Sequence, residues 1–341
     1  MPKSCNVKVL ISLFLLSFWI SAAGAVNAQS VVKIDGSSTV YPITQAVADQ
    51  FQEVKQGAIQ VTIAVSGSGG GFRKFCRGDI DIVNASRPIL KNEMKECKNA
   101  GVQYVEIPVA FDALTVAIHS GNTWSKTMTV AQLRKLWEPA AEGKITHWNQ
   151  INSIWPAEAI KLFGPARDSG TYDYFTEAIT GKAKSSRTDF TRSDDDTSLV
   201  QAVAGDKNGL GFLGFAYYIE NQDKVTAVAI DNGTGQGAVL PSVESVEDGS
   251  YQPLSRPMFI YVSLKSAGKP EVKEFVEFYL KNALLLVKET HFFPLPPRAY
   301  TTMLGHFNKK RAGTVFNGVP VIGLTIDELI RREERLQYEN Y

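Results

Sequence analysis

The chain has 341 residues, with 36 basic and 35 acidic side chains and a formal charge of +1 at pH 7. So balanced a composition offers no basic face to a polyanion, and we exclude a nucleic acid as the partner. The length exceeds what one hydrophobic core usually holds, so we expect two domains.

The first 28 residues have the pattern of a secretory signal peptide. Lys3 and Lys8 precede an apolar run from Val9 to Ile20, and small residues follow up to Ala28. This order is typical of an export leader, and we place the cleavage near Ala28. The apolar run is too short to favour a membrane-spanning helix. Loss of the two lysines changes the formal charge to −1, and we expect a soluble, exported protein.

Two cysteines remain after the leader, Cys76 and Cys97. In an oxidising compartment, two cysteines about 20 residues apart favour one disulfide, and the alternative is two buried free thiols. No histidine lies near either cysteine at the spacing of zinc ligands, so we expect no metal there.

The glycines of Gly209–Gly214 have dinucleotide-motif spacing, but the run follows a helix and a loop, so we interpret it as a strand and expect no cofactor.

Three units of strand, polar loop and helix are predicted in the first hundred residues. The strands are Val31–Ile34, Ile59–Val65 and Asp81–Asn84, and the helices are Ile43–Val54, Phe72–Cys76 and Glu93–Asn99. The loop after each strand carries hydroxyls, glycines or an arginine. A further strand is predicted over Val102–Val109.

A fourth unit of this kind follows later in the chain. The apolar run Ala159–Phe163 predicts a strand, Gly164 and Pro165 end it, and Tyr172–Ile179 predicts a helix. The intervening residues offer an arginine, two hydroxyls and a flexible backbone at a helix N-terminus, which is the chemistry of an oxyanion site. The alternative is that Ser169 or Thr171 only caps the helix.

Two β-rich runs, Ala113–His119 and Pro257–Leu264, are predicted to cross between the two domains. In an open α/β sheet, ligands bind at the carboxyl ends of the strands, so the four polar loops are expected to converge on one small anion. The acidic run Asp194–Asp196 lacks the ligand pattern of a calcium loop, and we interpret it mainly as a helix cap. Helices are also predicted over Val130–Trp137, Leu199–Ala204, Val272–Val287 and Thr325–Tyr338.

The four loops together resemble a known family. Gly36–Pro42, Ser66–Gly71, Ala85–Pro88 and Arg167–Thr171 are similar, in this order and spacing, to the loops of the PstS-type phosphate-binding components of bacterial ABC importers. The resemblance covers essentially the whole exported chain. It implies an α/β fold of two lobes, the type II periplasmic binding protein fold, which closes around its ligand. We assign 29–114 and 258–341 to lobe I and 115–257 to lobe II.

The resemblance also implies a set of phosphate-binding residues. They are Ser38, Thr39, the backbone of Val40, Ser68, Arg167, Ser169, Gly170 and Thr171. Asp168 would orient Arg167. Arg87 stands where some family members have an aspartate that accepts the proton of hydrogen phosphate. Arg87 is therefore expected to bind the anion itself, with a structural ion pair as the alternative, and Asp168 or a backbone carbonyl would take the proton.

These features predict a binding protein, not an enzyme. It would capture inorganic phosphate in the periplasm and deliver it, as a monomer, to the membrane permease of an ABC importer. The alternatives are another tetrahedral oxyanion, such as sulfate or molybdate, and a sensor of phosphate. An exported phosphatase would need a nucleophile with a base, or metal ligands. The histidines His119, His147, His291 and His306 lie outside the four loops, so we do not favour that class.

Overall fold

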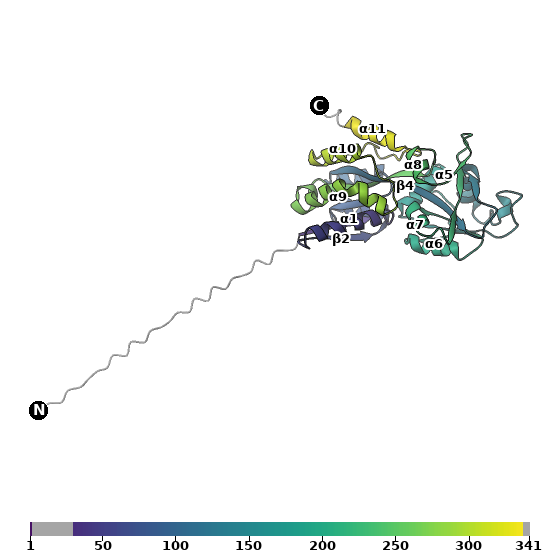
Figure 1. The fold of residues 1–341 in the computed structure, drawn as a ribbon, viewed down its shortest axis with the longest axis horizontal. Helices are drawn as coiled ribbons and strands as arrows, with labels where there is room; N and C mark the ends of the chain where they lie inside the picture. Colours follow the sequence, from purple (N-terminus) through teal and green to yellow (C-terminus); the bar gives the residue numbers. More distant parts are fainter. Residues whose placement is uncertain (2–29, 337–341) are drawn as a thin grey trace.

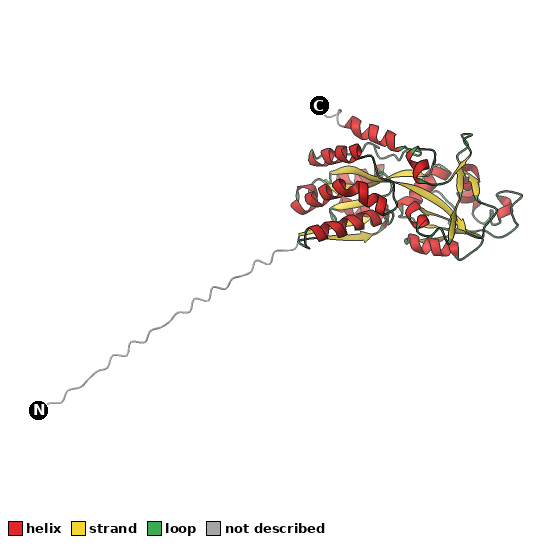
Figure 2. Ribbon diagram, viewed as in Figure 1, coloured by secondary structure: helices red, strands yellow, loops and turns green. Residues whose placement is uncertain are grey.

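A mixed sheet of nine strands extends through both halves of the part of the chain that the structure describes (Figure 2). The structure is a computed structural model that describes Met1 and residues 30–336. The predicted signal peptide and its cleavage site lie outside these residues, apart from Met1. Within them, the model contains no helix with the length and apolar character needed to cross a bilayer. The strands lie in the order β2 (Ile59–Val65), β1 (Ser30–Gly36), β3 (Ile82–Ala85), β12 (Ser255–Ser263), β4 (Tyr104–His119), β8 (Gly209–Gly214), β6 (Lys161–Pro165) and β7 (Thr191–Ser193), with β9 (Val225–Ala227) beside β4.

The first half of the sheet and the helices around it form lobe I, on the left in Figure 1. Strands β1 and β3 run parallel to each other, and their apolar side chains are largely buried, as expected for a sheet covered on both faces. The elements of lobe I are β1 (Ser30–Gly36), α1 (Tyr41–Val54), β2 (Ile59–Val65), α2 (Gly67–Arg77), β3 (Ile82–Ala85), α3 (Lys91–Asn99), β12 (Ser255–Ser263), η3 (Ser266–Gly268), α9 (Pro270–Glu289), α10 (Pro297–Asn308) and α11 (Ile326–Leu336).

Lobe II continues the sheet and adds a small second sheet, in the order β11-β10-β5. Its core is aromatic: the rings of Phe175 and Phe212 stack at 3.8 Å, and Trp137 meets both edge-on. The elements are β5 (Thr127–Thr129), α4 (Val130–Trp137), η1 (Pro139–Ala141), η2 (Trp148–Gln150), β6 (Lys161–Pro165), α5 (Gly170–Thr180), β7 (Thr191–Ser193), α6 (Asp196–Ala204), β8 (Gly209–Gly214), α7 (Phe215–Ile219), β9 (Val225–Ala227), β10 (Ala229–Asp231), β11 (Ala238–Val239) and α8 (Val243–Glu247).

One long strand, β4 (Tyr104–His119), connects the lobes. Its first part pairs with β12 as far as Ala113, and from Leu114 onwards it pairs with β8. The predicted crossing at Ala113–His119 is thus confirmed. The return crossing was placed wrongly, because β12 stays in lobe I beside β3 and β4. The chain returns just before β12, where the amide of Leu114 donates to the carbonyl of Leu254 at 2.8 Å.

Two other local expectations changed with the structure. The stretch Ser66–Gly71, predicted as a loop, is the N-cap and first turns of α2. Helix packing explains this, because the side chains of Phe72 and Phe75 are fully buried and fix the helix against the sheet. Helix α10 was not predicted at all, although its neighbour α11 was.

The predicted disulfide between Cys76 and Cys97 is present and joins α2 to α3. The alternative of two free thiols is therefore wrong. The two cysteines are 21 residues apart in the sequence, so the bond closes a short loop of lobe I.

Removal of this bond should lower the stability of the protein. A loop of this length loses about 3 kcal/mol of unfolded-state entropy when it is closed. We expect the double variant Cys76→Ser/Cys97→Ser to melt at a lower temperature than the parent protein. Calorimetry with and without a reductant is the measurement. A reductant should shift the melting temperature of the parent and leave that of the double variant unchanged; equal melting temperatures of the two proteins would contradict the expectation.

Candidate functional site

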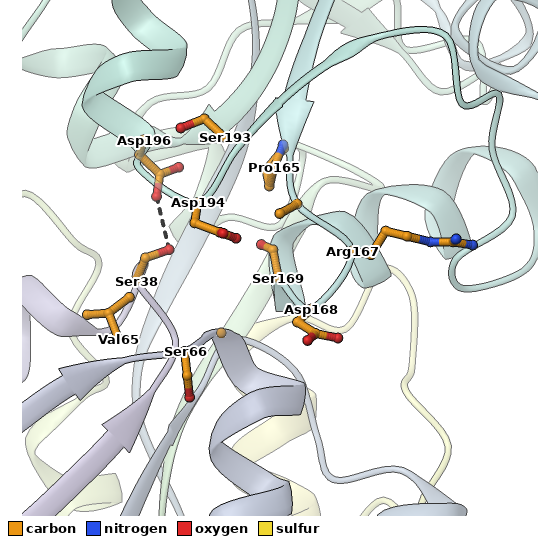
Figure 3. A pocket seen from close by; sticks show the side chains of 12 residues that line it. Ser38, Val65, Ser66, Pro165, Arg167, Asp168, Ser169, Ser193, Asp194 and Asp196 are labelled. Atoms are coloured by element: carbon orange, nitrogen blue, oxygen red, sulfur yellow. Dashed lines mark hydrogen bonds between the residues drawn. The ribbon is translucent and has the colours of Figure 1, made fainter.

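A polar cavity of about 240 Å³ lies between the two lobes (Figure 3). Lobe I contributes the loop after β1 and the start of α2, and lobe II contributes the loops after β6 and β7. The lining residues are Ser38, Val65, Ser66, Gly67, Pro165, Ala166, Arg167, Asp168, Ser169, Ser193, Asp194 and Asp196. Loops after β1, β2 and β6, which the sequence singled out, therefore meet at one place.

Helices α1, α2, α5 and α6 all begin at or beside this cavity. Local sequence explains two of these starts. The Ser169 hydroxyl accepts a hydrogen bond from the amide of Thr171, and the Asp195 carboxylate accepts from the amides of Thr197 and Ser198. The capping interpretation of the acidic run is thus confirmed, and Ser169 both caps α5 and lines the cavity. Because a helix N-terminus carries a partial positive charge and unpaired N–H groups, four of them favour an anion in the space that they surround.

Buried hydroxyls of both lobes meet next to the cavity. The side-chain oxygens of Thr39 and Thr171 lie 2.9 Å apart, and those of Ser68 and Ser86 lie 3.2 Å apart. Gly170 packs against the two serines so closely that a Cβ there would lie 2.4 Å from the Ser86 oxygen and 2.5 Å from the Ser68 oxygen. Only glycine fits this position, and its backbone brings lobe II against the serines of lobe I.

Sequence reasoning missed a charged pair at the base of this cluster. Arg256 on β12 stands opposite Asp112 on β4, with both side chains fully buried and 2.9 Å between Nη2 and Oδ2. The same Nη2 donates to the hydroxyl of Thr171 at 2.8 Å. Nη1 is buried without a hydrogen-bond partner among the described residues. The available signal was the presence of charges in two largely apolar strands, since buried charges require partners: Arg256 is the one charged residue of β12, and Asp112 is one of two acidic residues of β4.

Asp196 is a second missed residue. Its side chain lines the cavity, is buried, and accepts a hydrogen bond from the hydroxyl of Ser38 at 3.2 Å (Figure 3). Its other oxygen, Oδ1, has no hydrogen-bond partner in the described part of the chain. Burial raises the pKa of the Asp196 carboxyl to about 6, against the lowering effect of Ser38.

One of two predicted roles beside the cavity needs correction. Arg167 lines the cavity but is exposed, and in Figure 3 its side chain points away from the other lining residues. Asp168 pairs with Arg73 of α2 at 2.8 Å instead of with Arg167, so it does not orient Arg167. The hydrogen bond from Arg73 holds the pKa of Asp168 below its usual range. Arg73, two residues after the glycine-rich run Ser66–Gly71, thus reaches across to the other lobe.

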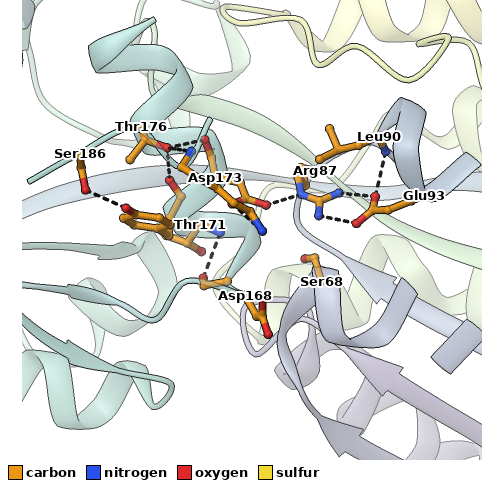
Figure 4. Close-up of polar contacts among 12 residues, drawn as sticks. Ser68, Arg87, Leu90, Glu93, Asp168, Thr171, Asp173, Thr176 and Ser186 are labelled. Carbon is orange, nitrogen blue, oxygen red and sulfur yellow. Dashed lines mark hydrogen bonds and ion pairs between the residues drawn. The ribbon is translucent and has the colours of Figure 1, made fainter. Parts of the chain in front are cut away.

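Arg87 is also corrected, because its guanidinium is already bound to carboxylates (Figure 4). Nε donates to Asp173 at 2.8 Å, and Nη1 and Nη2 donate to Glu93 at 2.9 and 2.7 Å. Burial alone would lower the pKa of Arg87, but Glu93 and Asp173 raise it, so the side chain stays charged. Arg87 is not among the described residues that line the cavity. The structure thus contains the alternative that we considered for Arg87, a structural ion pair.

The remaining predictions concern the backbone of Val40, metal binding and the histidines. The amide of Val40 is the N-cap amide of α1 and lies 3.4 Å from the hydroxyl of Ser37. Among the described residues, no group of three or more His, Cys, Asp or Glu side chains is arranged to hold a metal ion. All the histidines fall in described positions, and none of them lines the cavity.

Two α/β lobes joined by a crossing strand, with a polar cavity between them, define a two-lobed binding protein. A family model described as a PBP superfamily domain matches residues 22–283. Protein SphX of Synechocystis sp. is 47% identical over 95% of this chain and 96% of its own length. The phosphate-binding protein PstS of Staphylococcus saprophyticus is 33% identical over 79% of this chain and 82% of its own length.

A solved structure agrees with these relatives. A phosphate ABC transporter substrate-binding protein from Clostridium perfringens, with bound phosphate, is 27% identical and aligns with a TM-score of 0.66 over 78% of this chain and 100% of that chain. The chain therefore belongs to the PBP superfamily and, within it, to the family of the PstS and SphX proteins.

The raised pKa of Asp196 predicts a pH-dependent cost in stability. Between about pH 4 and 6 the folded protein keeps the Asp196 proton that the unfolded chain has lost, so the free energy of unfolding falls as the pH rises through this window. Asp196→Asn removes this cost. We expect it to stabilise the unliganded protein by about 1–3 kcal/mol at pH 8 and by far less at pH 4.

Urea unfolding at both pH values measures this effect. Asp194→Asn is the matched control, because Asp194 lines the same cavity but is exposed. A gain in stability for Asp196→Asn that is equal at pH 4 and pH 8 would show that the Asp196 carboxyl has an ordinary pKa.

Proposed function

We propose that this protein captures inorganic phosphate outside the cytoplasm and delivers it to the membrane permease of an ABC importer. The observation that carries the proposal is the meeting of four helix N-termini and a cluster of buried hydroxyls from both lobes at one cavity. Relatives named phosphate-binding proteins, and a solved relative with bound phosphate, support the choice of ion.

The chemistry of the site suits a small, doubly charged ion. Transfer of such an ion out of water is costly unless each of its oxygens receives hydrogen bonds. We assign the hydroxyls of Ser38, Thr39, Ser68 and Thr171, with the amides at the starts of α1, α2 and α5, as donors from two directions. Ser38 lines the cavity, and the other three hydroxyls belong to the buried cluster of both lobes. Arg256 adds a buried positive charge behind Thr171, and its free Nη1 is one more donor. The guanidinium of Arg256 takes the place that we had assigned to those of Arg87 and Arg167.

Asp196 supports phosphate over sulfate as the ligand. Phosphate carries a proton at neutral pH, whereas sulfate does not, so a hydrogen-bond acceptor at the site distinguishes the two. Of the carboxylates that line the cavity, Asp168 is paired with Arg73 and Asp194 is exposed. Asp196 is buried, and its Oδ1 is unpaired within the described structure. Its carboxylate is the acceptor that we assign to the phosphate proton, in place of Asp168.

The wider role follows from the family. The Clostridium perfringens relative is a substrate-binding protein of a phosphate ABC transporter, which favours delivery to a permease over sensing alone. The predicted leader places the protein in the periplasm, where we propose that it acts as a monomer. Closure of the lobes about β4 would enclose the ion, which is a hinge motion of two rigid bodies.

Replacement of one buried hydroxyl tests the site. Thr171→Val keeps the shape of the side chain but removes the oxygen that contacts Thr39 and Arg256. Because a hydrogen bond to a charged group is worth about 1.5–3 kcal/mol, the dissociation constant for phosphate should rise at least tenfold. Titration calorimetry is the measurement. The control is Thr301→Val on the exposed face of α10, which should bind as the parent does. Equal affinities of all three proteins would remove Thr171 from the site.

Asp196→Asn tests the discrimination between ions. Parallel titrations with phosphate, arsenate, sulfate and molybdate should show the parent protein preferring the protonated ions. An asparagine offers a donor as well as an acceptor, so the ratio of phosphate to sulfate affinity should fall by about fivefold or more, in line with about 1–3 kcal/mol for an unpaired buried group. Asp194→Asn is again the control. A parent protein that prefers sulfate would refute the proposed ligand, and an unchanged ratio would refute only the role of Asp196.

A further inference from the structure

Arg87 crosses from one lobe to the other in a fully buried ion pair. It follows β3 of lobe I, and its Nε donates to Oδ2 of Asp173 on α5 of lobe II at 2.8 Å (Figure 4). Both side chains are 1% exposed. The proposed function gives this pair no part in ligand binding, because Nε of Arg87 is bound to Asp173 and its two terminal nitrogens are bound to Glu93.

The guanidinium is held in place entirely by lobe I, apart from its contact with Asp173. Glu93 accepts from Nη1 and Nη2, and the carbonyl of Pro88 accepts from Nη1 at 3.1 Å. Glu93 is itself held, since its Oε2 accepts from the amide of Leu90 at 2.9 Å. Nε therefore points toward lobe II whether or not lobe II is in contact. Separation of the lobes would remove its partner, Asp173.

Asp173 depends on this contact more than Arg87 does. Its Oδ1 makes no hydrogen bond within the described residues, and Nζ of the half-exposed Lys184 lies 3.8 Å from it. Asp173 lies in the first turn of α5, directly after the capping run Ser169–Thr171. A contact that fixes Asp173 therefore also fixes the end of α5 that meets Ser68 and Ser86.

We propose that Arg87 and Asp173 form a latch. The latch positions the loop after β3 against the start of α5 and holds the lobes closed. The pair is complete only when the lobes are together. Opening of the lobes leaves Arg87 with Glu93 and returns Asp173 to water. The latch acts on the closed state, so it slows release of the ligand and has little effect on its entry. Only the ligand-release part of this proposal rests on the proposed function.

A second pair between the lobes offers a matched comparison. Arg73 and Asp168 also join lobe I to lobe II at 2.8 Å, but their side chains are 53% and 46% exposed. Exposed pairs of this kind contribute little because water screens and solvates both partners. Loss of this pair should therefore change closure far less than loss of the buried one.

The test compares Asp173→Ala with Arg73→Ala. Asp173→Ala removes the latch and leaves Arg87 paired with Glu93, whereas a change at Arg87 would leave two carboxylates unpaired. Spin labels on Val54→Cys and Ile154→Cys, exposed residues of lobes I and II, report the distance between the lobes in the exported form without residues 1–28. We expect Asp173→Ala to shift the unliganded protein to longer distances and to speed phosphate release at least tenfold. The association rate should stay within about threefold, because entry precedes closure.

Arg73→Ala should behave as the parent protein in both measurements. If Asp173→Ala does not fold, the same two measurements are made on Asp173→Asn, whose side chain has the same shape as that of Asp173. An unchanged distance distribution and an unchanged release rate in a folded Asp173 variant would overturn the latch, as would an equal effect of Arg73→Ala. If the parent protein does not bind phosphate, the proposed function fails, and the distance measurement without ligand still decides the latch.

Discussion

Charges buried at the junction of the lobes set the constraint on which the rest of the structure depends. Removal of a guanidinium or a carboxylate from water costs several kcal/mol unless a partner of opposite charge meets it. Arg256 finds Asp112 on the neighbouring strand, and Arg87 finds Asp173 on the opposite lobe. The second of these pairs exists only while the lobes are in contact. The proposed latch makes the arrangement of the lobes depend on this pairing of charges as well as on apolar packing.

The same junction prepares the site. Arg256 donates to Thr171, Thr171 contacts Thr39, and both threonines precede or begin helices that point at the cavity. A donor set drawn from two lobes is incomplete in either lobe alone. On the proposed function, the ion enters before closure and gains its full set of hydrogen bonds only when the lobes come together, so closure stabilises the bound state.

Sequence patterns predicted most of the frame of this molecule. Strand, polar loop and helix followed one another with clear changes of hydrophobic period, so β1, α1 and β2 were placed within two residues of their bounds. Partners of charged side chains were not predictable in this way, because Arg87 and Asp173 are far apart in the sequence. A loop motif indicates that an arginine lies near the cleft, but only packing decides whether its guanidinium faces the cavity or a carboxylate. Arg256 and Asp196 were missed for the same reason.

The link between Cys76 and Cys97 gives lobe I a dependence on redox state. Helix α2 begins with Ser66 and Gly67 at the cavity wall, and the disulfide ties its far end to α3. In a reducing compartment α2 would lose that tie, and its donors would be less firmly placed. We therefore expect the N-terminal turn of α2 at the cavity wall to be held less firmly when this bond is reduced than when it is formed.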